Sequence, residues 1–129
     1  MTQRVTLATI DIQNILTDYA AAWCEPDIDR RRAFLENAWS DDGTYQDPSV
    51  EAVGREQLIA LIGDMHQKFP GARVEITSGV SEHHGKVYFE WEMIAGDGSF
   101  AIRGVDFGSF SADGRLSKIV GFFGPPPAL

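Results

Sequence analysis

The chain has 129 residues, of which 43% are hydrophobic and 23% are charged, and its formal net charge at pH 7 is -8. Residues 1–129 are long enough and apolar enough to form a single folded domain, which excludes a disordered chain. The negative charge would repel phosphate polyanions, which excludes nucleic acid and anionic membranes as partners.

The cysteine content and the first residues indicate a cytoplasmic protein. Cys24 is the only cysteine, so no internal disulfide can form, which is typical of a reducing compartment. The sequence MTQRVTLATIDIQ lacks the apolar run and cleavage site of a signal peptide. No stretch of the chain approaches the roughly 18 apolar residues of a membrane-spanning helix.

The first part of the chain has the apolar spacing of helices. This spacing predicts one helix over residues 11–24, which Pro26 ends. Asp27 is a candidate N-cap for a second helix. The expected buried face of that helix comprises Phe34, Leu35, Ala38 and Trp39. Its expected solvated face comprises Arg30, Arg31 and Arg32.

A short strand and a third helix are expected next. Asp41-Asp42-Gly43 predicts a turn, and a short strand over residues 44–46 stops before Pro48. The third helix begins near Gly54 and ends at Pro70-Gly71. Its expected inner face comprises Leu58, Leu61, Ile62, Met65 and Phe69.

The second half of the chain changes to the two-residue period of strands. Alternation of apolar and polar residues predicts strands over residues 73–80 and 87–93. Gly96-Asp97-Gly98 predicts a hairpin, and strands over residues 99–111 and 116–123 complete the pattern. Three helices with a series of long strands indicate an α+β fold, in which helices pack on one face of a curved, mostly antiparallel sheet.

Asp106 is a polar residue on a strand face that is otherwise apolar. It shares parity with Ile102 and Phe110, and Gly104 and Gly108 are its neighbours on that face. A two-residue period therefore points the carboxyl inward, with room left beside it by the glycines. Burial without a cation would keep the carboxyl neutral and able to donate a hydrogen bond. A bulge or a paired arginine would instead give it a purely structural role.

Tyr19 and Asp47 are further candidate functional residues. Tyr19 lies on the apolar stripe of the first helix, so its hydroxyl is buried and needs a partner, which a backbone carbonyl could supply. Asp47 lies at the end of the short strand, where the following proline favours extended backbone. It is either a catalytic base or an ordinary turn residue.

The histidines give no pattern of metal ligands. His66 borders the inner stripe of the third helix, and His83 and His84 are expected to point apart in a turn. No residue spacing indicates a metal, nucleotide or redox cofactor. Cys24 has no base partner in sequence and is expected to be a small buried hydrophobe.

Two segments give a resemblance that covers nearly the whole chain: TDYAAAWCEPDIDRRRAFLENAWSDDGTYQDP and GVDFGSFSADGRLSKIVGFFG. They resemble the nuclear-transport-factor-2-like superfamily, and within it the SnoaL-like and ketosteroid isomerase-like branch. This resemblance implies a cone-shaped, cystatin-like fold with a central apolar cavity. It also implies a homodimer that forms through the outer face of the sheet.

The resemblance implies roles for three residues. Tyr19, Asp47 in Gln46-Asp47-Pro48 and Asp106 in Val105-Asp106-Phe107 fall on the catalytic positions of ketosteroid isomerases. In that family the loop aspartate is the base, while the strand aspartate stays protonated beside the tyrosine. The resemblance therefore implies an isomerase or related lyase that moves a proton next to a carbonyl.

The expected ligand is a small, apolar, carbonyl-containing molecule. The residues expected to line its cavity are Trp23, Trp39, Met65, His66, Phe69, Trp91 and Phe110. Two alternatives stay open: a non-catalytic ligand-binding or interaction domain of the same fold, and a SnoaL-like polyketide cyclase. The cyclase fits less well because residues 116–123 contain no acid that could act as its catalytic carboxylate.

Overall fold

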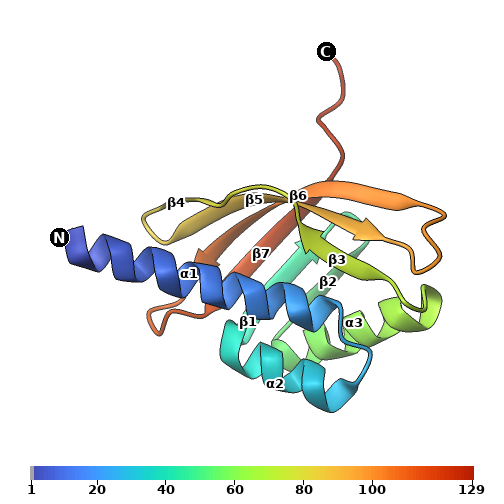
Figure 1. Cartoon of the computed structure of the whole chain (residues 1–129), viewed down its shortest axis with the longest axis horizontal. Helices are drawn as coiled ribbons and strands as arrows, with labels where there is room; N and C mark the ends of the chain where they lie inside the picture. The colour runs from blue at the N-terminus through green and yellow to red at the C-terminus, as the bar shows by residue number, and fades with distance from the viewer. Residues whose placement is uncertain (1) are drawn as a thin grey trace.

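The computed structural model describes residues 2–129, with side chains described from residue 11 onward. The elements in chain order are α1 (Thr2–Trp23), α2 (Ile28–Ala38), β1 (Trp39–Asp47), β2 (Val50–Val53), α3 (Arg55–Lys68), β3 (Arg73–Ile76), β4 (Ser81–His83), β5 (Lys86–Ile94), β6 (Ala101–Phe110) and β7 (Leu116–Phe123) (Figure 1). Within the described residues, no helix combines the length and the apolar character needed to cross a membrane.

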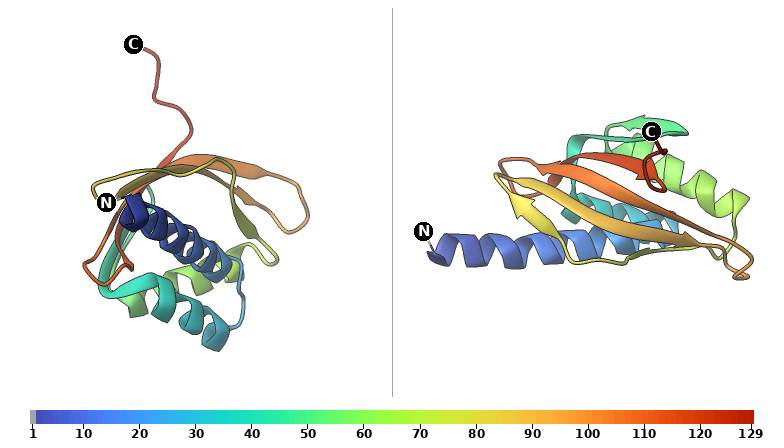
Figure 2. Two further views of the ribbon diagram at one scale, coloured as in Figure 1. Left: turned by 60° about the vertical axis from the view of Figure 1, so that its left-hand side comes forward. Right: turned by 90° about the horizontal axis from the view of Figure 1, so that it is seen from above.

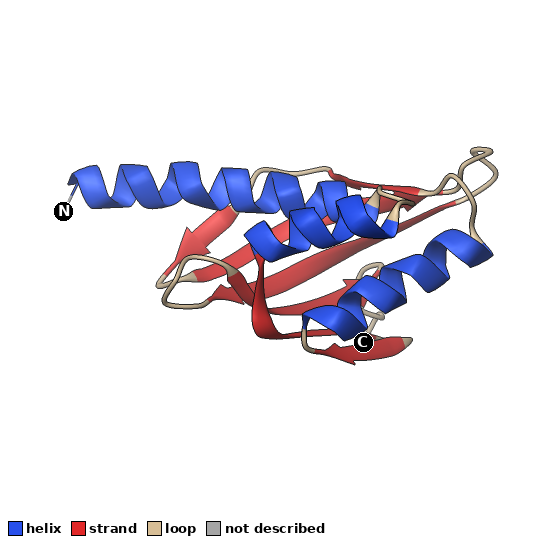
Figure 3. Cartoon of the chain, turned by 90° about the horizontal axis from the view of Figure 1, so that it is seen from below, coloured by secondary structure: helices blue, strands red, loops and turns tan. Residues whose placement is uncertain are grey.

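The strands form one curved sheet with helices on a single side. The strand order is β2-β1-β7-β6-β5-β3, and β4 pairs with β5 beside this path. The β1–β7 pair is parallel, and the remaining pairs are antiparallel. All three helices cover the same face (Figure 3), while the opposite face of the sheet carries no helix (Figure 2). This arrangement confirms the predicted α+β fold.

Strand β5 shows why the sequence folds in this way. Its side chains alternate between buried and less buried positions, and the buried set is Val87, Phe89, Trp91 and Met93. Strand β6 pairs with β5 so that Phe89 lies opposite Asp106, and Trp91 lies opposite Gly104. A two-residue period therefore places Asp106 on the same inner face as the apolar core of β5.

Two backbone predictions are wrong, because in each segment one strand has more residues than the partner strand opposite it. Residues 73–80 do not form one strand: β3 ends at Ile76 and β4 begins at Ser81, because residues 77–80 lie opposite only Phe89 and Glu90 of β5. The predicted turn at residues 41–43 lies inside β1, where residues 40–43 lie opposite Ser117 alone. Extra residues in one strand of a pair must leave the ladder, which bends the strand.

The second helix begins as predicted but has a different solvated face. Asp27 is its N-cap and accepts a hydrogen bond from the Arg30 N–H at 3.0 Å. Trp39 lies beyond the helix end, as the first residue of β1. Arg31, which was expected in solvent, is only 3% exposed.

Three backbone carbonyls explain the burial of Arg31. Its guanidinium donates to Glu25 O at 3.0 Å, to Pro26 O at 3.0 Å and to Ile59 O at 3.1 Å. These bonds join the α1–α2 connection to α3. Gly63 lets the guanidinium approach α3, because a Cβ at this position would lie 3.0 Å from Arg31 Nη1.

Arg31→Ala is expected to lower the free energy of unfolding by about 3 kcal/mol, because it leaves buried carbonyls without their donor. Arg31→Lys should restore little of this loss, since one ammonium cannot match the planar fork of a guanidinium. Urea unfolding would measure both variants. Arg30→Ala is the control, because Arg30 is exposed and its ion pair with Glu25 is worth little. A loss below about 1 kcal/mol for Arg31→Ala would contradict the structural role of Arg31.

Candidate functional site

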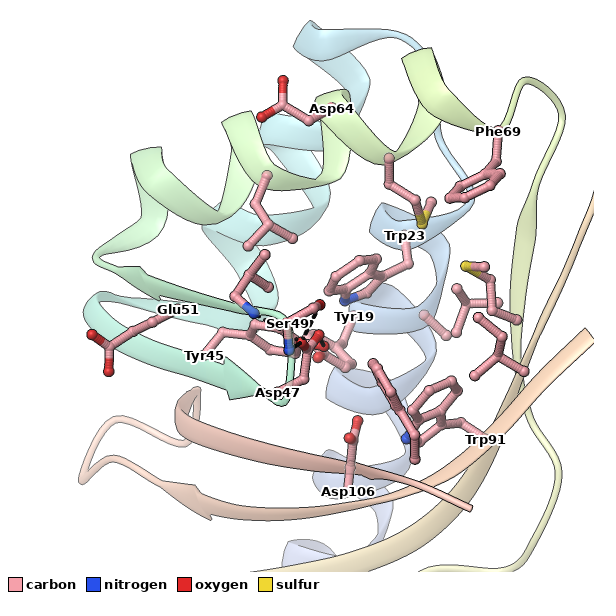
Figure 4. A pocket seen from close by; sticks show the side chains of 18 of the residues that line it. Tyr19, Trp23, Tyr45, Asp47, Ser49, Glu51, Asp64, Phe69, Trp91 and Asp106 are labelled. Atoms are coloured by element: carbon pink, nitrogen blue, oxygen red, sulfur yellow. Dashed lines mark hydrogen bonds between the residues drawn. The ribbon is translucent and has the colours of Figure 1, made fainter.

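A cavity of about 650 Å³ lies between the helices and the inner face of the sheet. This volume is in the range of small-molecule binding sites. Most of its wall is apolar, and its lining includes Trp23, Met65, Phe69, Phe89, Trp91, Met93 and Phe123. Four polar side chains lie near one another in this wall: Tyr19, Tyr45, Asp47 and Asp106 (Figure 4).

Asp106 has its predicted inward position in β6. Its side chain is only 5% exposed, and its Oδ1 has no hydrogen-bond partner among the described residues. The pKa of Asp106 is raised from its ordinary value of 3.8 to about 7, chiefly by burial, with the Trp91 N–H opposing the shift and the charge of Asp47 adding to it. The carboxyl is therefore neutral in a large fraction of molecules at neutral pH.

The space around Asp106 differs from the expectation. The positions beside Gly104 and Gly108 are filled by the side chains of Trp91 and Ile119, so these glycines do not leave room for a ligand. Room for the carboxyl comes from Gly121 of β7, the cross-strand partner of Asp106. A Cβ on Gly121 would lie 2.8 Å from Asp106 Oδ1, so any larger residue would displace the carboxyl.

Tyr19 is buried, as its place on the apolar stripe predicted, and it lines the cavity. Its ring is 4% exposed, stacks on Trp39 at a centroid distance of 5.6 Å and meets the edge of Trp23 at 6.4 Å. Burial raises the pKa of the Tyr19 hydroxyl well above its ordinary value, and the charges of Asp106 and Asp47 raise it further. The hydroxyl therefore stays a neutral donor. No hydrogen bond joins Tyr19 to Asp106 among the described side chains.

Asp47 is held by four hydrogen bonds. Its Oδ1 accepts from Ser49 N at 2.8 Å, Ser49 Oγ at 2.7 Å and Val50 N at 3.1 Å. Its Oδ2 accepts from the Tyr45 hydroxyl at 2.6 Å. A carboxylate has about four lone-pair positions, two on each oxygen, so Oδ1 is saturated while Oδ2 keeps one free. The oxygen with capacity to accept a proton is Oδ2.

The two aspartates lie on either side of one glycine. Asp47 ends β1, Asp106 is in β6, and Gly121 of β7 runs between them; a Cβ on Gly121 would lie 3.5 Å from Asp47 Cβ. Four hydrogen-bond donors hold the Asp47 carboxyl in place, whereas burial favours the neutral form of Asp106. The free lone pair on Oδ2 of Asp47 can accept a proton, and the protonated Asp106 carboxyl can donate a hydrogen bond, as general acid–base chemistry requires.

Tyr45 and Ser49 are the site residues that sequence reasoning missed. Tyr45 is 5% exposed, and burial raises the pKa of its hydroxyl far above the ordinary value, so it remains a donor to Asp47. Two signals could have found them. Tyr45 shares strand parity with Asp47, and a serine two residues after an aspartate is typical of a turn that the aspartate side chain closes.

The structure places four of the seven residues predicted to contact a ligand in the lining of the cavity. Trp23, Met65, Phe69 and Trp91 line the cavity. Trp39, His66 and Phe110 do not: Trp39 is fully buried behind Tyr19, and the His66 Nε2 faces Trp23 O at 2.9 Å. Phe110 lies at the end of β6, where it pairs with Leu116 and packs against the core.

The remaining histidines and the cysteine lie outside the cavity lining. His83 and His84 do not point apart, because their Nδ1 atoms are 3.1 Å from each other. Cys24 is partly buried, and its Sγ lies 3.2 Å from Val74 O and 3.3 Å from Val74 N, which joins the end of α1 to β3. In the part of the chain that the structure describes, no group of three or more His, Cys, Asp or Glu side chains could hold a metal ion.

The chain is similar to known proteins in sequence and in fold. The model of the SnoaL-like domain family matches residues 16–119. A candidate isomerase of the SnoaL-like family from Agrobacterium tumefaciens is 34% identical, with a TM-score of 0.79 over 97% of this chain and 100% of that chain. No curated protein matches the chain in sequence.

Two more distant structures show the same fold. A protein with a cystatin-like fold from Methylobium petroleophilum is 16% identical, with a TM-score of 0.76 over 92% of this chain and 79% of that chain. A protein with a ketosteroid isomerase-like fold from Catenulispora acidiphila, bound to trimethylamine, is 19% identical, with a TM-score of 0.67 over 83% of this chain and 82% of that chain.

Asp106→Asn is expected to make the chain more stable at alkaline pH. The folded chain keeps a proton on Asp106 that the unfolded chain releases, so the stability contributed by the neutral carboxyl is complete below pH 3.8 and is lost as the pH rises to about 7. Each unit of pKa difference between the folded and unfolded chain changes the free energy of unfolding by about 1.4 kcal/mol. Above this pH range, the unmodified chain should therefore have lost up to about 4 kcal/mol that Asp106→Asn does not lose.

Urea unfolding between acidic and alkaline pH would measure this difference. The gap between Asp106→Asn and the unmodified chain should grow as the pH rises and then become constant. Asp29→Asn, at an exposed position on α2, controls for the loss of a carboxylate elsewhere. Parallel pH profiles for Asp106→Asn and the unmodified chain would show that the carboxyl is not held neutral.

Proposed function

We propose that this chain, which belongs to the SnoaL-like domain family, is an isomerase or related lyase of the ketosteroid isomerase type. It would move a proton next to the carbonyl group of an apolar molecule without a cofactor. The observation that carries this proposal is the buried carboxyl of Asp106, which faces the cavity close to a hydrogen-bonded carboxylate. The 34% identity to a candidate isomerase supports the same class of reaction.

The proposed reaction begins with proton removal by Asp47. Its Oδ2 takes a proton from the carbon next to the carbonyl, and the electron pair of that C–H bond moves onto the carbonyl oxygen to give a dienolate. Asp47 then returns the proton to another carbon of the conjugated system. The carbonyl forms again, so the product is an isomer of the substrate.

Tyr19 and neutral Asp106 would stabilise the negative oxygen of the dienolate. Both are buried donors whose protons are retained at neutral pH, in part for Asp106 and fully for Tyr19. Fixed donors in a dry site need no reorganisation when charge develops, and each is worth roughly 2.7–4 kcal/mol of the barrier. Tyr45 and Ser49 would act as positioning residues, because they hold Asp47 rather than the substrate.

The lining supports an uncharged, apolar substrate. Aromatic, aliphatic and sulfur-containing side chains make up most of the cavity wall, and acidic residues outnumber basic ones in it, with Lys68 as the cation among the described lining residues. An anionic substrate would meet Asp47 and a net charge of -8. A ketone of fused or linked rings fits a cavity of about 650 Å³.

A homodimer is the proposed assembly. The outer face of the sheet exposes Tyr88, Phe107 and Phe122 on three adjacent strands, and the rings of Tyr88 and Phe107 are 4.7 Å apart. Contiguous exposed apolar side chains are typical of protein interaction sites. A second copy packed here would leave the cavity, on the opposite face, free to bind its ligand.

Turnover of 3-oxo-Δ5-steroids and of smaller β,γ-unsaturated ketones tests the proposed reaction. Asp47→Asn is expected to lower kcat by about 10²–10⁴-fold while ligand binding is retained, because it removes the base and keeps the shape. Asp29→Asn, outside the cavity lining, should have unchanged kcat. No turnover of either ketone class would reject the isomerase assignment. Unchanged ligand binding in Asp47→Asn and Asp106→Asn, without turnover in any variant, would favour a binding domain.

Phe107→Glu tests the proposed dimer, because a charge on the outer face would disfavour burial against a second copy. Sedimentation velocity should give a dimer for the unmodified chain and a monomer for the variant. Val53→Glu is the control, since Val53 is as exposed as Phe107 but lies on β2 at the edge of the sheet. A monomeric unmodified chain would refute the dimer.

A further inference from the structure

The indole N–H of Trp91 is a buried donor in the wall of the cavity. Trp91 is 8% exposed and lines the cavity, and its Nε1 has no hydrogen-bond partner among the described residues. Buried indole N–H groups usually find a partner, and an unpaired one is unfavourable for folding. Apolar packing alone could be provided by phenylalanine, so the N–H needs its own explanation.

The sheet fixes the orientation of the indole. Trp91 of β5 lies opposite Gly104 of β6, and a Cβ at position 104 would overlap the six-membered ring of Trp91. The glycine therefore lets the indole lie against β6. The edge of Phe123 packs on it at a centroid distance of 5.9 Å and an interplanar angle of 82°. With the ring held by both neighbours, the direction of the N–H is set by the fold.

The N–H points toward the carboxyl of Asp106. In Figure 4 the indole nitrogen lies on the edge of the ring that faces Asp106. The N–H is close enough to favour the ionised form of this carboxyl, yet no hydrogen bond of normal geometry joins the two groups. Two adjacent buried groups are thus unpaired, and both belong to the lining of the same cavity.

We propose that the Trp91 N–H is a direct donor to the ligand oxygen, at a site that it forms with Asp106 and Tyr19. This inference rests on the proposed function for the identity of the ligand, an oxygen that carries or develops negative charge. A ligand oxygen between Trp91 and Asp106 satisfies both groups at once, which neither can do for the other in the free chain.

The chemistry of the indole adds specificity. Tyrosine and a protonated carboxyl can each donate or accept a hydrogen bond, whereas the indole N–H can only donate. A ketone, an enolate or a phenolate oxygen can accept from Trp91, but an ammonium group cannot. The site therefore selects ligands with an acceptor oxygen, because a ligand without one would leave the buried donor unpaired.

NMR of the three tryptophan indole N–H groups tests this contact directly. The probe is a phenol acidic enough to be ionised at a pH where Asp106 still carries its proton. Its binding should move the Trp91 indole proton downfield, as a new hydrogen bond to an anionic oxygen does, and the Trp91→Phe spectrum assigns that signal. The Trp39 signal should stay in place, because Trp39 lies outside the cavity lining.

Trp91→Phe tests the contribution of the N–H to affinity. The variant keeps an aromatic ring against Gly104 and Phe123 and removes only the donor, so phenolate affinity should fall by about tenfold or more. The matched control is Trp39→Phe, which also removes a buried, unpaired indole N–H. Its phenolate affinity should not change, and circular dichroism should show both variants folded.

An unmoved Trp91 signal, including one that results because no phenol binds, would overturn the inference. Unchanged phenolate affinity in Trp91→Phe would do the same. These results are separable from the proposed function. A moved Trp91 signal without ketone turnover would keep the oxygen site and reject the isomerase, whereas normal kcat and KM in Trp91→Phe would keep the isomerase and reject the role of Trp91.

Discussion

The carboxyl of Asp106 is buried in an apolar wall, and the polar groups that influence its pKa are an indole and another carboxyl rather than a cation. Such a group resists ionisation because its charge cannot be solvated. Two glycines of the surrounding sheet make space for this arrangement. Gly121 leaves the volume that Asp106 Oδ1 occupies, and Gly104 leaves the volume that the Trp91 indole occupies. The protonation state of Asp106 then sets the charge at this point of the cavity wall.

The pairing of strands brings the two carboxyl groups together with different environments. The parallel β1–β7 pair and the antiparallel β7–β6 pair place Asp47 and Asp106 on either side of Gly121. Asp47 lies at a strand end, where the following turn supplies donors from Ser49 and Val50. Asp106 lies in mid-strand, where its own backbone is committed to the ladder and no turn can reach its side chain. Strand end and strand centre thus give the same residue type two different environments: Asp47 accepts four hydrogen bonds, whereas Asp106 Oδ1 has no partner among the described residues.

Local periodicity was enough to predict the α+β class, the inward direction of Asp106 and the burial of Tyr19, because strand and helix periods decide which face a side chain occupies. It could not predict the bulges in β1 and between β3 and β4, since these depend on how many residues the partner strand offers. It also failed for Arg31, whose carbonyl partner Ile59 lies 28 residues away. The shared strand parity of Tyr45 and Asp47 could have predicted that their side chains lie on the same face. The hydrogen bond between them could not be predicted in this way, because it depends on the turn that positions the Asp47 carboxyl.

The parallel pairing of β1 with β7 also affects how the molecule assembles. It joins residues 39–46 to residues 116–120, so more than half of the chain lies between the two partners. Closing a loop of this length loses much chain entropy before contacts compensate, and such pairings form late in folding. During synthesis, Gly121 of β7, which lies between Asp47 and Asp106, is missing until this last strand leaves the ribosome. The wall of the cavity is therefore complete only in the finished domain.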